Sequence, residues 1–178
     1  MAANRVLSWN PENNPFRTRS NAARAEIRVT PQLLMVEDNP GDVYLIRQAL
    51  REAGFECRMT VAADGDEALG ILHRENGEHR LPDMVLLDLN LPKRSGHEVL
   101  REIKSDPQLR RIPVIVLSSS QAESDLRTAY DLHANCYIHK PSTLSEVLHV
   151  AQQIASFWFS AVSLPRGSTG VVEQRSER

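Results

Sequence analysis

Five polar side chains each follow a short apolar run, and together they could bind a divalent cation. Glu37 and Asp38 follow Leu-Leu-Met-Val, Asp88 follows Met-Val-Leu-Leu, Ser118 follows Val-Ile-Val-Leu, and Lys140 follows Cys-Tyr-Ile-His. Three carboxylates in one cleft would repel, because unit charges about 4 Å apart cost about 4 kcal/mol per pair at an effective dielectric of about 20. Lys140 could supply one positive charge, and Mg²⁺, a hard cation that takes oxygen ligands, could supply the rest. These residues predict a Mg²⁺ site if their elements bring them together.

Five apolar runs alternate with five segments of helical periodicity, which is the pattern of a parallel sheet covered by helices on both faces. We expect strands at 33–36, 58–62, 84–88, 114–117 and 136–139 and later helices at 66–76, 96–104, 122–132 and 144–159. The first helix should be capped by Asn39, carry Pro40 in its first turn and end at Gly54. The sequence therefore predicts an α/β protein with five strands and five helices.

Right-handed crossovers leave few topologies for such a chain, and we expect the flavodoxin-like, doubly wound order 2-1-3-4-5. In this order ligands bind at the carboxyl ends of the strands, where the five polar residues lie. Cys57 and Cys136 should lie near opposite edges of the sheet, which argues against a disulfide between them.

Composition divides the chain into three parts. Residues 1–30 are polar, with five Arg and two Glu, and we expect a flexible tail there and another at 165–178. The folded domain should span 31–164, where 13 Lys and Arg face 19 Asp and Glu, so its net charge of −6 disfavours nucleic-acid binding. The basic first tail could touch an acidic partner. No run approaches the ~18 apolar residues of a membrane span and no signal peptide is visible, so we expect a cytoplasmic protein.

Four motifs in this order resemble the response-regulator receivers. They are VEDNP at 36–40, LLDLNLP at 86–92, VLSS at 116–119 and YIHKP at 137–141, with the acidic pair and the Lys each at a predicted strand end. The resemblance implies that a partner histidine kinase phosphorylates Asp88 in a Mg²⁺-dependent reaction. It further implies that Glu37, Asp38, Asp88 and the backbone carbonyl of Asn90 bind the metal, that Ser118 and Lys140 contact the phosphoryl group, and that Ser118 and Tyr137 are switch residues.

A narrower resemblance lies in DLHANCYIHKP at 131–141 and FWFSAVSLP at 157–165. Both are similar to single-domain response regulators of phytochrome-type kinases in bacteria and cyanobacteria, although His139 stands where we would expect Thr. The resemblance implies a stand-alone receiver whose output is a protein contact and which catalyses only its own phosphorylation and dephosphorylation. Two alternatives stay open: a degenerate receiver that only binds partners, and a Mg²⁺-dependent aspartyl-phosphate phosphatase.

Two expectations concern the last part of the domain. By resemblance, the Lys140–Pro141 bond should be cis. In the last helix, a stripe at helical spacing should cover the sheet, namely Leu144, Val147, Leu148, Ala151, Ile154, Ala155, Trp158 and Val162. Val150, Phe157 and Ala161 fall beside this stripe and form a second apolar patch. This patch predicts a homodimer, unless the chain's own tail folds over it.

Overall fold

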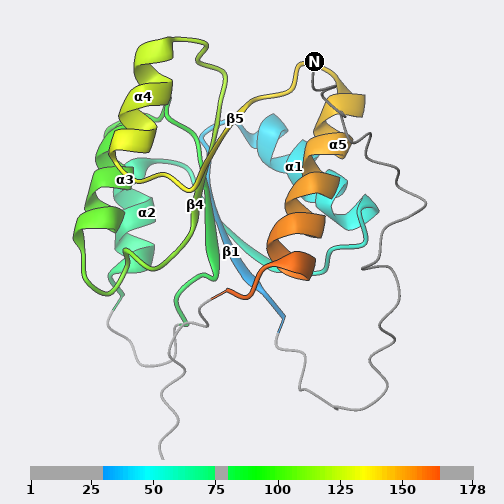
Figure 1. Ribbon diagram of the computed structural model, residues 1–178, viewed down its shortest axis with the longest axis horizontal. Helices are drawn as coiled ribbons and strands as arrows, with labels where there is room; N and C mark the ends of the chain where they lie inside the picture. Colours follow the sequence, from blue (N-terminus) through cyan, green and yellow to red (C-terminus); the bar gives the residue numbers. More distant parts are fainter. Residues whose placement is uncertain (1–29, 75–79, 165–178) are drawn as a thin grey trace, which may run out of the picture.

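The computed structural model describes residues 30–74 and 80–164 as one sheet with helices on both faces (Figure 1). The strands are β1 (Gln32–Val36), β2 (Arg58–Ala62), β3 (Met84–Leu87), β4 (Val114–Ser118) and β5 (Cys136–His139). The helices are α1 (Pro40–Glu52), α2 (Gly65–Leu72), α3 (Gly96–Ser105), α4 (Glu123–Asp131) and α5 (Leu144–Ser156), and a π-helical segment, Phe157–Ala161, follows α5.

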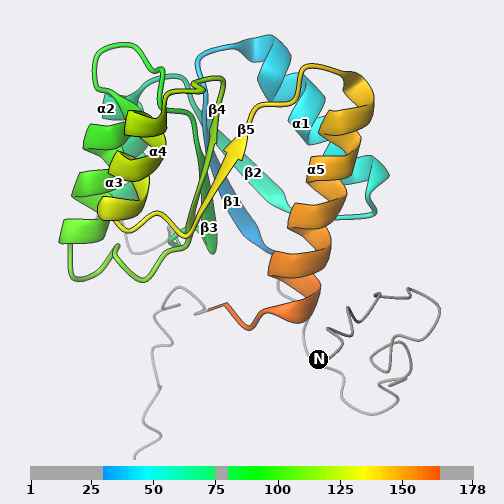
Figure 2. The ribbon, with the colours of Figure 1, turned by 45° about the horizontal axis from the view of Figure 1, so that its top comes forward.

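All strand pairs of the sheet are parallel, and the strand order is β2-β1-β3-β4-β5. Helices α1 and α5 cover one face, and α2, α3 and α4 cover the other (Figures 1 and 2). Because both faces are covered, β1, β3 and β4 are almost fully buried, as their unbroken apolar runs predicted. The flavodoxin-like α/β fold is confirmed.

Local signals set where the helices begin. Asn39 caps α1 by accepting a hydrogen bond from the Gly41 amide at 2.8 Å, and Pro40 opens the helix. Gly54, with φ of 73°, follows its end, in the left-handed conformation that suits Gly. Thr143 and Glu146 form a capping box at the start of α5. These caps place the helix starts at the carboxyl edge of the sheet.

Several predicted boundaries differ from the structure. Strand β3 ends one residue before Asp88. Helix α2 ends at Leu72, so its predicted extension through His73 and Arg74 is wrong, and the predicted last residue, Asn76, lies outside the described residues. Nearly all of the predicted tails, 1–29 and 165–178, lies outside them too. Cys57 and Cys136 are free thiols, as expected. Within 30–74 and 80–164, the helices are all too short or too polar to cross a bilayer.

The stripe predicted to cover the sheet from α5 holds except at its two ends, because Leu144 is exposed and Val162 lies in extended backbone after the π-helical segment. Val147, Ala151 and Ile154 are buried in the core between α5 and α1. Leu144 is 60% exposed, so its predicted place against the sheet is wrong. Leu144 is the first residue of α5, and periodicity specifies the direction of a side chain around the helix, not where along the axis the helix meets the sheet. Only the later turns of α5 therefore pack on the core.

The partly buried side chain of Lys104 in α3 should make the stability of the fold depend on pH. Its ammonium donates to the Ile112 carbonyl at 2.8 Å and to Asn135 Oδ1 at 2.9 Å, and none of the ion pairs found in the described part of the chain includes it. Burial lowers the pKa of Lys104 to about 8. The unfolded chain keeps the ordinary Lys pKa of about 10.4, so between the two values the unfolded state binds more protons and stability rises with pH.

We expect this gain to disappear in Lys104→Met. Between about pH 7 and about pH 10, the free energy of unfolding of the wild type should rise relative to that of the variant by about 1–2 kcal/mol. Urea unfolding of both proteins across this range measures the difference. A difference that stays constant with pH would show that the Lys104 ammonium keeps its proton in the folded state.

Candidate functional site

Glu37 and Asp38 lie directly after β1 at the carboxyl edge of the sheet. Glu37 is buried. Its Oε1 accepts a hydrogen bond from the Asn39 amide at 3.2 Å, and its Oε2 forms an ion pair with Lys140 Nζ at 2.7 Å. Burial raises the pKa of the Glu37 carboxyl, and the contacts with Lys140 only partly offset this. Asp38, by contrast, is exposed. The pair therefore presents one carboxylate inside the cleft and one at its mouth.

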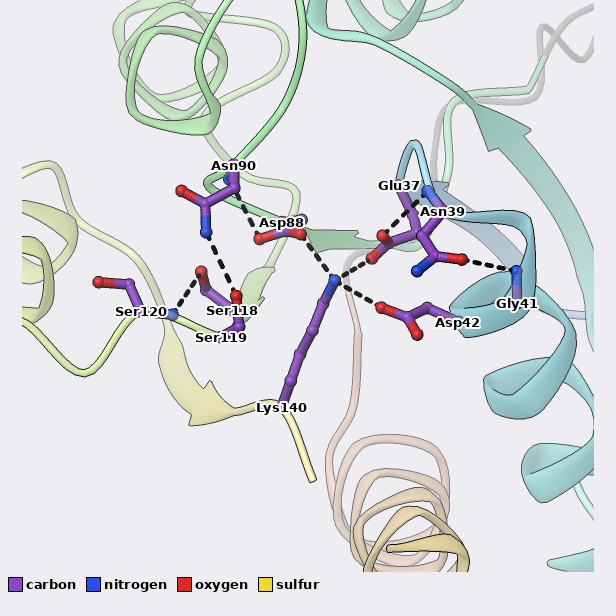
Figure 3. Close-up of polar contacts among 10 residues, drawn as sticks. All are labelled: Glu37, Asn39, Gly41, Asp42, Asp88, Asn90, Ser118, Ser119, Ser120 and Lys140. Atoms are coloured by element: carbon purple, nitrogen blue, oxygen red, sulfur yellow. Dashed lines mark hydrogen bonds and ion pairs between the residues drawn. The ribbon is translucent and has the colours of Figure 1, made fainter. Parts of the chain in front are cut away.

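Asp88 follows β3, the strand next to β1 in the sheet. Its side chain is buried, with Oδ2 at 2.7 Å from Lys140 Nζ and Oδ1 accepting from the Asn90 amide at 3.1 Å (Figure 3). The Asn90 side chain points away and donates to Ser119 Oγ at 3.4 Å. Asp88 is thus held in one orientation from both sides, by a cation and by its own loop.

Lys140 follows β5 and reaches across the cleft to three carboxylates. Its Nζ lies 2.7 Å from Glu37, 2.7 Å from Asp88 and 2.9 Å from Asp42. Burial alone would lower the pKa of Lys140, but the hydrogen bonds to Asp88, Glu37 and Asp42 outweigh it and hold this pKa above its ordinary value. The side chain is a permanent cation at the centre of the site.

The donor set fits a hard divalent cation. Within the described residues, the group of acidic side chains close enough to share an ion comprises Glu37, Asp38 and Asp88, whose ligand atoms lie within 4.8 Å of one another. The one Lys140 ammonium cannot neutralise these three charges and Asp42 as well. Carboxylate oxygens at this spacing are ligands that Mg²⁺ and Mn²⁺ accept. The predicted metal residues are therefore brought together, with the Asn90 backbone beside them.

The residues predicted to respond to phosphorylation form a second network beside Asp88. Ser118, at the end of β4, is fully buried, and its Oγ accepts from the Ser120 amide at 3.4 Å. The Ser120 carbonyl in turn accepts from Tyr137 Oη at 3.1 Å and lies 3.1 Å from His139 Nδ1. The rings of Tyr137 and His139 meet edge to face, with centroids 5.3 Å apart. Ser118 and Tyr137 are thus joined through one loop residue, Ser120.

The prediction of a cis Lys140–Pro141 bond is wrong. The described residues contain no cis peptide bond. A trans bond is the lower-energy form by about 0.5–1 kcal/mol, and Lys140 Nζ reaches Asp88 at 2.7 Å without the cis form. The trans bond therefore already directs the Lys140 side chain toward Asp88.

Two features of the site were missed by the sequence analysis. Asp42 lies in the first turn of α1. Its position five residues after Glu37 could have indicated that it lies near the site, because the helix begins at the edge of the sheet where the site lies. Asp64 accepts from Lys93 Nζ at 2.5 Å, which ties the loop before α2 to the loop after Asp88. The partner of Asp64 could not have been inferred, because the pair joins two separate loops.

Comparisons with known proteins identify relatives along most of the chain. The family described as "Response regulator receiver domain" matches residues 33–152. The response regulator Rcp1 of Synechocystis sp. is 41% identical over 136 residues, which cover 75% of this chain and 92% of Rcp1. The structure resembles the phosphorylated cyanobacterial phytochrome response regulator RcpA (TM-score 0.73, 45% identity, 77% of this chain and 99% of RcpA). It also resembles the Mn²⁺-bound form of Rcp1 (TM-score 0.71, 40% identity, 76% of this chain and 99% of that chain).

Proposed function

The chain belongs to the response regulator receiver family, and we propose from this premise that Asp88 is the residue that accepts the phosphoryl group. The observation that carries the proposal is the position of Asp88. Its buried carboxylate lies at the end of β3, paired with Lys140 at 2.7 Å and grouped with Glu37 and Asp38. Nucleophile, cation and metal ligands are thereby assembled in one cleft.

Each side chain has a part in the transfer. An oxygen of Asp88 attacks the phosphorus of the donor's phosphohistidine as the bond between phosphorus and the imidazole nitrogen breaks, and the imidazole leaves and takes a proton from solvent. Lys140 pairs with the phosphoryl oxygens as negative charge develops on them. Ser118 Oγ is placed to donate to the same group after transfer. A divalent cation held by Glu37, Asp38, Asp88 and the Asn90 carbonyl would neutralise charge on the transferred phosphoryl group. The chain thus acts on its own aspartate, and the same groups would serve its dephosphorylation.

The relatives support a proposal about the partner. RcpA is a phytochrome response regulator, and we propose a phytochrome-type histidine kinase as the donor to this chain, with transfer in the cytoplasm. Phosphorylation adds charge and strong acceptors beside Ser118, which is linked through Ser120 to Tyr137 and to the start of α4. A rearrangement of this loop would change the surface that partner proteins contact.

The test of the proposed function is phosphorylation in the presence and absence of metal. Acetyl phosphate with Mg²⁺ should add one phosphoryl group to the intact protein, and EDTA should abolish the addition. Asp38→Ala should lower the phosphorylation rate by about 100-fold or more while the protein stays folded, because the exposed ligand is lost without opening the core. Asp131→Ala, which removes an exposed carboxylate of α4, is the matched control. Phosphorylation that continues unchanged in EDTA would contradict the metal's role.

We also propose that the chain forms a homodimer through the patch of Val150, Phe157 and Ala161. Phe157 is 56% exposed and Ala161 is exposed, whereas Val150 packs partly against the core between α1 and α5. A large aromatic side chain left in water favours burial against a partner.

Sedimentation of the wild type and of Phe157→Asp, with and without phosphorylation, tests the dimer. The wild type should dimerise at micromolar concentration, and Phe157→Asp should be monomeric. Tyr44→Asp places the same charge on α1, at a side chain that is 61% exposed, and should dimerise like the wild type. A monomeric wild type in both states, or a Phe157→Asp variant that still dimerises, would rule out this interface.

A further inference from the structure

Asp42 is a fourth carboxylate of the site, outside the group of side chains that could share a metal ion. It lies in the first turn of α1, where the Asn39 cap and Pro40 start the helix at the carboxyl edge of the sheet. Its Oδ2 lies 2.9 Å from Lys140 Nζ, and its side chain is 35% exposed (Figure 3). Asp42 therefore meets Lys140 from the side opposite Asp88.

The ammonium of Lys140 donates hydrogen bonds to Asp42 and Asp88 and forms an ion pair with Glu37. An ammonium group carries three N–H donors. Three carboxylate oxygens, one each from Glu37, Asp42 and Asp88, lie within 2.9 Å of Nζ. A phosphoryl oxygen that pairs with Lys140 must therefore compete with these three carboxylates for the ammonium.

The three carboxylates are not equally free to leave. Glu37 and Asp88 belong to the group that would hold a divalent cation, so each has a second source of positive charge. The Asp42 carboxylate accepts hydrogen bonds, within the described part of the chain, from Lys140 alone. Once Glu37 and Asp88 bind a divalent cation, Asp42 is the carboxylate that still competes for Lys140.

We propose that Asp42 restrains phosphoryl transfer to Asp88. As a positioning residue it holds the Lys140 ammonium toward α1, and its negative charge opposes the approach of an anionic phosphodonor. The inference rests on the proposed role of Asp88 and adds a residue that sets how readily Asp88 is phosphorylated. Removing this charge weakens the competition for one N–H of Lys140, because a neutral acceptor holds an ammonium less strongly than a carboxylate does.

The experiment compares Asp42→Asn with the wild type, using acetyl phosphate at saturating Mg²⁺. A small donor has no protein surface, so its rate reports on the cleft and not on kinase docking. The initial rate of phosphorylation should rise about three- to tenfold in Asp42→Asn, because a like charge beside the incoming anion is removed. The ratio of the two rates should shrink as ionic strength is raised, a dependence that a structural defect would not produce. Asp42→Glu should restore a rate close to that of the wild type.

Two controls separate this effect from general charge and from folding. Glu52→Gln makes the same change of charge at the last residue of α1, away from the cleft, and should phosphorylate at the wild-type rate. Without metal, the ammonium resonance of Lys140 in ¹⁵N-labelled protein should exchange faster with water in Asp42→Asn, because one of three ion pairs is lost.

The outcomes distinguish this inference from the proposed function. If the wild type takes no phosphoryl group, or Asp88→Asn is labelled equally, the assignment of Asp88 fails. If the wild type is phosphorylated on Asp88 and Asp42→Asn reacts at the same rate or more slowly, the inference about Asp42 is overturned and the receiver function stands.

Discussion

Asp88→Asn should abolish phosphorylation of the chain by acetyl phosphate. The substitution keeps the size of the side chain and an oxygen that can accept from the Asn90 amide, but the amide is not a nucleophile for phosphorus. The negative charge that pairs with Lys140 at 2.7 Å is lost as well. We expect the rate to fall by at least about 1000-fold, below detection.

Intact mass spectrometry under mild conditions measures this loss, since an acyl phosphate is labile. Asp131→Asn, which neutralises an exposed carboxylate of α4, should be labelled like the wild type and controls for the change of charge. Similar thermal unfolding of Asp88→Asn and the wild type would show that the fold is intact. One phosphoryl group on Asp88→Asn would mean that another side chain is the acceptor.

Gly96→Ala should destabilise the protein by about 3 kcal/mol and disturb the phosphoacceptor itself. Gly96 begins α3, and a Cβ there would overlap the Asp88 carbonyl oxygen and lie 2.6 Å from Leu89 Cα. Both neighbours are backbone atoms, which cannot rotate away as a flexible side chain can. The loop that carries Asp88 must shift, and overpacking of this kind typically costs about 1–3 kcal/mol.

Gly70→Ala is the matched control for Gly96→Ala. Gly70 lies inside α2, and a Cβ there would meet no atom within 4 Å. This substitution should stabilise the protein by about 0.5–1 kcal/mol, because Ala is the better helix former. Urea unfolding measures both changes, and the phosphorylation rate should fall in Gly96→Ala alone. Equal stability of the two variants would show that the loop of Asp88 yields easily.

The sequence was sufficient for the order of the sheet and for most of the site. Unbroken apolar runs specified buried parallel strands, and a parallel sheet brings the ends of its strands to one edge. Glu37, Asp88 and Lys140, which stand 51 and 52 residues apart along the chain, could therefore be placed together before any contact was known. Their types, two acids and a base at strand ends, indicated the chemistry.

The contacts of helices with the site were decided by tertiary structure alone. Whether Asp42 reaches Lys140 depends on how the first turn of α1 sits against the end of β5, and sequence spacing does not determine that distance. The exposure of Leu144 depends in the same way on where α5 meets the sheet along its axis. The sequence by itself determined which residues meet at the edge, because local patterns locate the strands and the right-handed crossover rule leaves few orders for them. Only packing between elements decided that Lys140 is shared among three carboxylates, since that depends on distances of a few ångströms between separate helices and strands.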